Sequence, residues 1–138
     1  MKEEPEMTII ASEPDLQAVG KAMHVLDVHF EALNRGDEVR LLETLHFPHY
    51  RISTIGVQVW ESGDTYLADF HNRTDPGWAY SRWDYRNIVS GSADKVHVDG
   101  QFSRFDSQDR CLGSYRTLWI VTRVDNRWAA AARSSFAR

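Results

Sequence analysis

The feature of this sequence that most constrains its fold is a change in the spacing of apolar residues near Trp78. Before that point, apolar residues recur every three or four positions, as they do along amphipathic helices. After it, they alternate with polar residues in four segments, which is typical of strands in an antiparallel sheet. Helices followed by a run of strands predict an α+β domain in which the helices cover one face of the sheet.

Three helices are predicted in the first half of the chain. The first begins near Ser12, with Pro14 and Asp15 suited to its first turn, and it ends at Gly36. Its buried stripe is expected to consist of Leu16, Val19, Met23, Leu26, Phe30 and Leu33.

A second helix is predicted to start directly after its cap, Asp37, and to keep His46 in its last turn before Pro48. Its inward-facing residues are expected to be Val39, Leu41, Leu42 and Leu45. A shorter third helix is predicted to open at Ser62 and to end before a polar loop.

The remaining segments read as strands. Residues 50–60, with Gly56 in the middle, predict a β-hairpin or a kinked strand pair. Four further strands are expected at about 80–90, 95–105, 111–124 and 128–136. Because the connections between them are short and polar, neighbouring strands should be antiparallel. Helices across one face of such a sheet, if it bends, leave a conical cavity.

Composition narrows the class of protein. The length of 138 residues fits one domain, predicted at 12–138 after a flexible acidic leader at 1–11. The net charge is −4 and the arginines are dispersed, so a nucleic-acid-binding surface is not expected. The only cysteine is Cys111, and no apolar run is long enough to span a membrane, so a cytoplasmic location is predicted.

Several short strings resemble the nuclear-transport-factor-2-like superfamily, in its SnoaL-like branch of small, mostly bacterial proteins. The matching segments are 32–37 (Ala-Leu-Asn-Arg-Gly-Asp), 45–51 (Leu-His-Phe-Pro-His-Tyr-Arg), 94–98, 102–106 and 128–137, which ends in Arg-Ser-Ser-Phe-Ala. The resemblance implies a cone-shaped, curved antiparallel sheet with three helices on its concave face, as in cystatin-like folds. It also implies a ligand cavity and, commonly, a homodimer formed through the sheet.

His49 and Asp84 are the candidate catalytic residues. His49 lies near the predicted junction of helix and strand, where an imidazole can act as an acid or base near neutral pH. Asp84 can place a carboxylate at the open end of the cone, but it also fits a solvated ladder with Arg82 and Arg86 on the same strand face. Alternatively, His49 has no catalytic role and is simply the first residue of a strand.

His46 is a candidate substrate-binding residue, although it can equally stabilise the end of its helix. Its spacing from His49 also suits a zinc ligand pair. However, a proline lies between the two histidines and no third ligand is evident, so no metal and no cofactor are predicted.

Arginines and aromatic residues complete the candidate binding site. Arg51 shares a strand face with His49 and can bind an anionic or carbonyl oxygen, or form a surface ion pair. Arg104 ends a row of apolar residues, and Arg133 lies among alanines, so each points into a polar pocket, forms a buried pair or reaches solvent. The aromatic candidates, which suit a core or dimer interface equally well, are Trp60, Trp78, Trp83, Tyr115 and Trp119.

The function predicted from these residues is a pocket for a small apolar molecule. If it is catalytic, cofactor-free isomerisation, dehydration or cyclisation by proton transfer is expected. The alternatives are a non-catalytic ligand-binding or dimerisation module and a protein-binding domain that uses the open face of the sheet.

Overall fold

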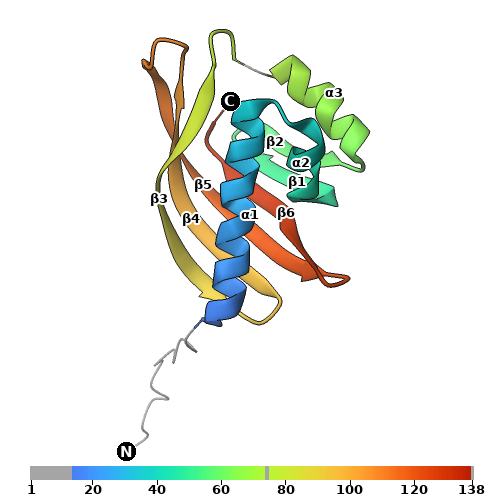
Figure 1. Ribbon diagram of the computed structural model, residues 1–138. Helices are drawn as coiled ribbons and strands as arrows, with labels where there is room; N and C mark the ends of the chain where they lie inside the picture. Colours follow the sequence, from blue (N-terminus) through green and yellow to red (C-terminus); the bar gives the residue numbers. More distant parts are fainter. Residues whose placement is uncertain (1–13, 74, 138) are drawn as a thin grey trace, which may run out of the picture.

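The computed structural model describes residues 14–73 and 75–137 (Figure 1). Its elements are α1 (Leu16–Arg35), α2 (Glu38–Glu43), β1 (Leu45–Ser53), β2 (Gly56–Trp60), α3 (Gly63–Arg73), β3 (Tyr80–Gly91), β4 (Lys95–Phe105), β5 (Cys111–Val124) and β6 (Arg127–Ser135). The predicted leader at 1–11 and the proposed cap Ser12 lie outside the described residues.

The six strands form one curved, open sheet in the order β2-β1-β6-β5-β4-β3. All neighbours are antiparallel except β1 and β6, which are parallel. Helix α1 crosses the concave face and contacts β3, β4, β5 and β6, while α3 lies near β2 (Figure 1). The predicted α+β class, the three helices and the curved sheet are therefore confirmed.

The predicted end of α1 at Gly36 is confirmed, but the helix begins at Leu16, so Pro14 and Asp15 precede it instead of lying in its first turn. Asp15 caps its start by accepting hydrogen bonds from the backbone N–H groups of Gln17 and Ala18. Gly36 ends it with φ of 68°, a left-handed conformation that costs glycine little. The predicted stripe needs one correction, because Leu16 is 81% exposed. The helix instead buries small residues such as Ala18 and Ala22 near its start.

Helix α2 is shorter than predicted. Asp37 caps it as expected, but it ends at Glu43, and the chain passes directly into β1 at Leu45. His46 is therefore a strand residue, and Val39 is exposed instead of facing inward. The physical reason is long-range pairing: Leu45 lies opposite Ala130 of β6, a contact that local helical spacing does not reveal.

The strand predictions at 95–105 and 111–124 agree with β4 and β5, and the hairpin at 50–60 is formed by β1 and β2. The predicted ladder of Arg82, Asp84 and Arg86 on one face is wrong. The register shifts between Trp83 and Tyr85, which indicates a β-bulge, and the extra residue reverses the side-chain alternation. Arg86 consequently pairs with Asp27 of α1 at 2.7 Å.

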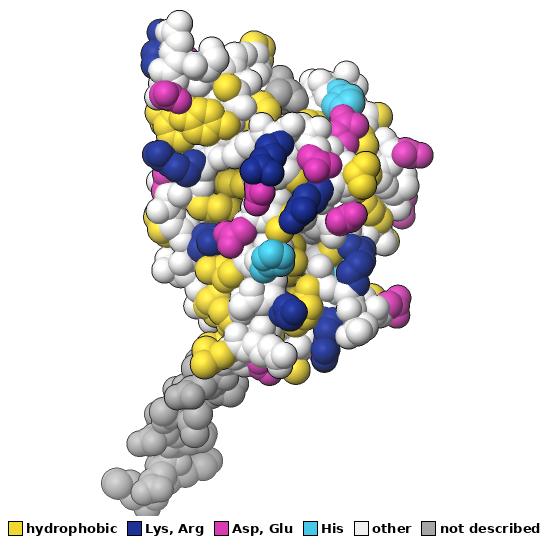
Figure 2. All heavy atoms as spheres, viewed as in Figure 1, with side chains coloured by type: hydrophobic (Ala, Val, Ile, Leu, Met, Phe, Trp, Pro, Cys, Tyr) yellow, Lys and Arg dark blue, Asp and Glu magenta, His cyan; other side chains and the backbone are white. Residues whose placement is uncertain are grey.

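The core lies between α1 and the concave face of the sheet. Its fully buried members include Leu26 of α1, Leu45 of β1, Val96 and Val98 of β4, and Val121 of β5. On the face shown in Figure 2, acidic and basic side chains are interspersed over the helices. Among the described residues, no helix is both long and apolar enough to cross a membrane.

Candidate functional site

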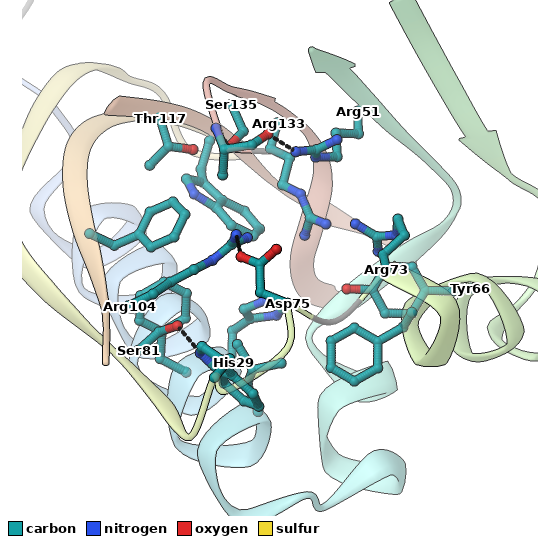
Figure 3. Close-up of a pocket in the computed structure, with 17 residues that line it drawn as sticks. His29, Arg51, Tyr66, Arg73, Asp75, Ser81, Arg104, Thr117, Arg133 and Ser135 are labelled. Carbon is teal, nitrogen blue, oxygen red and sulfur yellow. Dashed lines mark hydrogen bonds and ion pairs between the residues drawn. The ribbon is translucent and has the colours of Figure 1, made fainter. Parts of the chain in front are cut away.

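A cavity of about 90 Å³ is lined by residues of α1, α3 and the sheet, and it is large enough for several water molecules or a small organic group. Its polar and charged lining residues are His29, Arg51, Tyr66, Arg73, Asp75, Ser81, Arg104, Thr117, Arg133 and Ser135 (Figure 3). Its apolar and aromatic lining residues are Phe30, Leu33, Phe70, Trp78, Phe102, Trp119 and Ala137. The site thus combines an aromatic wall with an unusual concentration of arginine.

His29 projects from the buried face of α1 and is 3% exposed. Its Nδ1 lies 2.7 Å from Thr44 Oγ1, and the Thr44 hydroxyl donates its single hydrogen to the Leu41 carbonyl at 2.6 Å. Thr44 must therefore accept from His29, which places the imidazole proton on Nδ1. The unprotonated Nε2 is the nitrogen available to a molecule in the cavity.

The electrostatic surroundings keep His29 neutral. Burial lowers the pKa of His29 well below 6.5, and the positive charge of Arg133 lowers it further, with a smaller effect from His49. The indole of Trp119 contacts the imidazole edge-on, with the ring centres 5.0 Å apart. The cavity therefore contains a neutral imidazole with a fixed tautomer and a defined orientation.

Arg133 enters the cavity from β6 and is 8% exposed. The pairing of β5 with β6 shifts register at Ala131, which indicates a β-bulge in β6. Because the bulge adds one residue, Arg133 points to the same concave side as Ala130. Its guanidinium lies 5.0 Å from the ring centre of Trp119 and 5.9 Å from those of Trp60 and Tyr66. Within residues 14–73 and 75–137, neither an acidic side chain nor a hydrogen bond acceptor pairs with this guanidinium.

Two further arginines lie beside Arg133, one from β1 and one from the end of α3 (Figure 3). Arg51 donates to the Ala137 carbonyl at 2.5 Å and to Gln58 Oε1 at 3.2 Å, which are both neutral acceptors. Arg73 pairs with Asp69 at 2.9 Å. Burial and then the charges of neighbouring arginines lower the pKa of Arg51 to about 10, and burial followed by Arg133 lowers the pKa of Arg73.

The fourth arginine, Arg104, lies across the cavity and pairs with Asp75 at 2.6 Å (Figure 3). The side chain of Asp75 is 39% exposed, so this pair lies toward solvent. The start of β3 is held against α1 nearby, because the Asn34 amide bonds both backbone groups of Ser81 at 2.8 Å. This side of the cavity is therefore formed where α1 and the start of β3 pack against each other.

The structure brings five of the candidate site residues into the cavity lining: Arg51, Trp78, Arg104, Trp119 and Arg133. The remaining aromatic candidates pack around it: Trp60 bonds Asp69, Trp83 stacks on Phe30 with ring centres 4.4 Å apart, and Tyr115 lies against Phe102.

The three remaining candidates lie outside the lining. His49 is fully buried behind the cavity, where its Nδ1 donates to the Ala130 carbonyl at 3.0 Å. Its pKa is lowered to about 3, chiefly by burial and then by Arg133. His46 contacts the Thr122 carbonyl at 3.0 Å. Asp84 is exposed and accepts a hydrogen bond from Ser103 at 2.6 Å. Catalytic roles for His49 and Asp84 remain predictions.

Sequence reasoning overlooked four charged or titratable lining residues: His29, Tyr66, Arg73 and Asp75. For His29 a signal exists, since it lies three residues after Leu26 and four before Leu33, on the apolar stripe of α1. Arg73 and Asp75 have no comparable local signal, because their positions depend on how α3 packs. Among the described residues, no group of three His, Cys, Asp or Glu side chains is arranged to bind a metal ion.

No protein-family model matches this chain, and no curated protein matches it either. Solved structures do. An NTF2-like protein of unknown function from Shewanella oneidensis superposes with a TM-score of 0.69 at 20% identity, over 86% of this chain and 98% of that one. A ketosteroid isomerase-like protein from Erwinia carotovora atroseptica gives 0.66 at 14% identity, over 87% and 95%.

A third similar structure is a LinA-type hexachlorocyclohexane dehydrochlorinase from Novosphingobium barchaimii. It superposes with a TM-score of 0.70 at 16% identity, over 87% of this chain and 86% of that one. At such identities the similarity concerns the fold. The chain has the nuclear-transport-factor-2-like fold.

Proposed function

We propose that this protein is a cofactor-free enzyme that transfers a proton on a small molecule bound in the cavity, with His29 as the base. The observation that supports this most is the fixed tautomer of His29. Thr44 holds the protonated Nδ1, so the lone pair of Nε2 is available to a molecule in the cavity. A neutral imidazole oriented in this way is the arrangement that general-base catalysis requires.

The proposed step needs only the substrate and the imidazole of His29. A C–H bond of the substrate breaks as an N–H bond forms at Nε2, and the electron pair of the C–H bond moves into the substrate. The arginine-rich lining stabilises the negative charge that develops there. The imidazolium then returns its proton to another atom, which gives isomerisation, or to a departing group, which gives elimination.

Two similar structures carry names that fit this class of reaction. One is described as ketosteroid isomerase-like, and the other as a dehydrochlorinase, a name that denotes loss of hydrogen and chlorine from one molecule. Such names describe those proteins, and they support proton transfer here only as chemistry that the fold accommodates. Isomerisation, dehydration and cyclisation would all begin with the same proton transfer to His29, so one proposal covers all three reactions.

A second candidate, non-catalytic ligand binding, is favoured by one specific observation. Burial and the charge of Arg133 lower the pKa of His29 well below 6.5, which makes its imidazole a weaker base than an exposed histidine. A protein that only binds a ligand needs the arginines and the aromatic wall, and it does not need the free Nε2. The two functions differ in whether a bound molecule exchanges a carbon-bound proton.

The experiment is a thermal-shift screen of small acids, ketones and terpenoid and polyketide-like compounds, followed by incubation of each binder with the protein in D₂O. NMR then measures loss of carbon-bound protons and any new product. We expect at least one binder to exchange or convert, and His29→Gln to abolish the reaction while retaining binding. His24→Gln, at an exposed position on the same helix, is the matched control.

Equal exchange in the native protein and the His29→Gln variant would overturn the assignment of the base. Binding without exchange or conversion of any compound would favour the non-catalytic alternative. Activity lost in the His49→Gln or Asp84→Asn variant, but retained in His29→Gln, would instead support the catalytic pair predicted from the sequence.

A further inference from the structure

The arginines in the cavity are not equally neutralised by acidic partners. Arg73 is paired with Asp69, and Arg104 with Asp75. Arg51 donates only to a backbone carbonyl and a glutamine oxygen, and Arg133 stacks on aromatic rings. Among the described residues, the cavity therefore contains two buried positive charges, Arg51 and Arg133, that no carboxylate of the chain balances.

From this imbalance we infer that the natural ligand is a small organic carboxylate whose anionic group binds Arg133, with Arg51 beside it. The inference rests on the proposed function in one respect, since it names the substrate of the same cavity. It departs from the small apolar molecule predicted from the sequence. The aromatic lining remains available for the uncharged part of the molecule.

The geometry of Arg133 supports a carboxylate. Its contacts with Trp60, Tyr66 and Trp119 are made with ring systems, which attract the cation without accepting its N–H groups in a conventional hydrogen bond. A planar guanidinium retains paired donors along its edge, and these match the two oxygens of a carboxylate. An oxyanion supplied by a ligand gives these N–H groups the acceptor that no described side chain provides.

Trp119 provides a second observation. Its side chain lines the cavity and is 3% exposed, and its indole N–H makes no hydrogen bond within the part of the chain that the structure describes. An indole nitrogen can only donate, so this group also needs an acceptor. Trp119 of β5 and Arg133 of the neighbouring strand β6 thus both line the cavity, and neither has a hydrogen bond acceptor among the described residues.

Carboxylate binding would also affect the base. The charge of Arg133 is one of the causes that lower the pKa of His29. An anion on Arg133 offsets that charge, so His29 becomes a stronger base when the cavity is occupied than when it is empty. Proton transfer would then depend on the presence of the anionic substrate.

The test measures binding by isothermal titration calorimetry, with acetate, butyrate, succinate and benzoate at millimolar concentrations. Butyramide and benzamide are the matched neutral probes, and inorganic phosphate is the alternative oxyanion. We expect at least one carboxylate to bind and its amide to bind at least about 10-fold more weakly. Arg133→Met should weaken carboxylate binding by about 10-fold or more, and Arg133→Lys should weaken it less. Arg116→Met, at an exposed ion pair with Asp99, should leave it unchanged.

The inference is overturned if no carboxylate binds, if the amides bind equally well, if phosphate alone binds, or if folded Arg133→Met retains native affinity. Because the readout is binding, it is independent of turnover. If the protein binds carboxylates but exchanges no protons, the carboxylate ligand is supported and the proposed enzyme is disproved. If His29 is required for turnover of a neutral compound and no carboxylate binds, the proposed enzyme is supported and the carboxylate ligand is disproved.

Discussion

The guanidinium of Arg133 lies 5.0 Å from the ring centre of Trp119, and the imidazole of His29 contacts the same indole edge-on, with the ring centres also 5.0 Å apart. Trp119 is thus a shared neighbour of this cation and of the neutral base. Both neighbours are buried, and the charge of Arg133 acts on His29 through a region that contains little solvent. Anion binding and proton transfer are therefore expected to be coupled in this cavity.

Removing the charge of Arg133 should not destabilise the empty protein. Desolvation of a buried, unpaired cation costs several kcal/mol, whereas its cation–π contacts return about 0.5–2 kcal/mol each. We expect the free energy of unfolding of Arg133→Met, measured with urea at pH 7, to equal that of the native protein or to exceed it by up to about 2 kcal/mol. A loss of several kcal/mol would show that Arg133 is structurally required.

Thr44→Val should destabilise the protein by about 1–3 kcal/mol, because it leaves the buried Nδ1–H of His29 without an acceptor. Thr44→Ser retains the hydroxyl and should cost less. Urea unfolding measures the stability, and NMR of the imidazole nitrogens identifies the tautomer. We expect a protonated Nδ1 in the native protein and in Thr44→Ser. A protonated Nε2 in the native protein would contradict the assigned tautomer.

Much of this fold could be predicted because strand alternation is a local property. The parity that links Val96 and Val98 to Arg104 correctly placed Arg104 on the concave side, where it lines the cavity. The ends of β4 and β5 could be predicted equally well, because polar turns separate the strands. Such local patterns hold until a bulge interrupts them, as it does near Asp84 in β3.

The residues that were missed depend on tertiary packing. His29 is a single histidine on an apolar helical stripe, which sequence alone does not distinguish from a core position. Leu45 and His46 were assigned to a helix because their partner strand, β6, lies about 80 residues later in the chain. His49 consequently lies behind the cavity wall, in a place that no local pattern specifies.

Acidification should destabilise the protein through its buried histidines. The pKa of His49 is lowered from 6.5 to about 3 by burial and then Arg133, and that of His29 is also lowered. Below pH 6.5 the unfolded chain binds protons that the folded chain excludes, so the free energy of unfolding falls as the pH drops toward 3. Each such histidine contributes about 1.4 kcal/mol per pH unit at most.

His49→Gln should therefore reduce this slope between pH 6 and pH 4 by about 1 kcal/mol per unit, whatever its effect on stability at pH 7. His24→Gln, at an exposed position, should leave the slope unchanged. Urea unfolding at several pH values provides the measurement. Identical slopes for the His49 variant and the native protein would mean that His49 accepts a proton in the folded state.

The outer face of the β1–β2 hairpin should form a dimer interface. Tyr50 lies opposite Val59, and Ile52 opposite Val57, and these four side chains are 43–64% exposed. His49 and Arg51, which alternate with Tyr50 and Ile52 along β1, are buried on the other face. Adjacent exposed apolar pairs of this kind favour association.

We expect sedimentation equilibrium to show a dimer, in line with the homodimer that the resemblance implies. Ile52→Lys with Val57→Lys should produce monomers, because like charges at an interface cost several kcal/mol. Val89→Lys, exposed on β3 at the other edge of the sheet, should remain dimeric. A native protein that is monomeric at high concentration would disprove the interface.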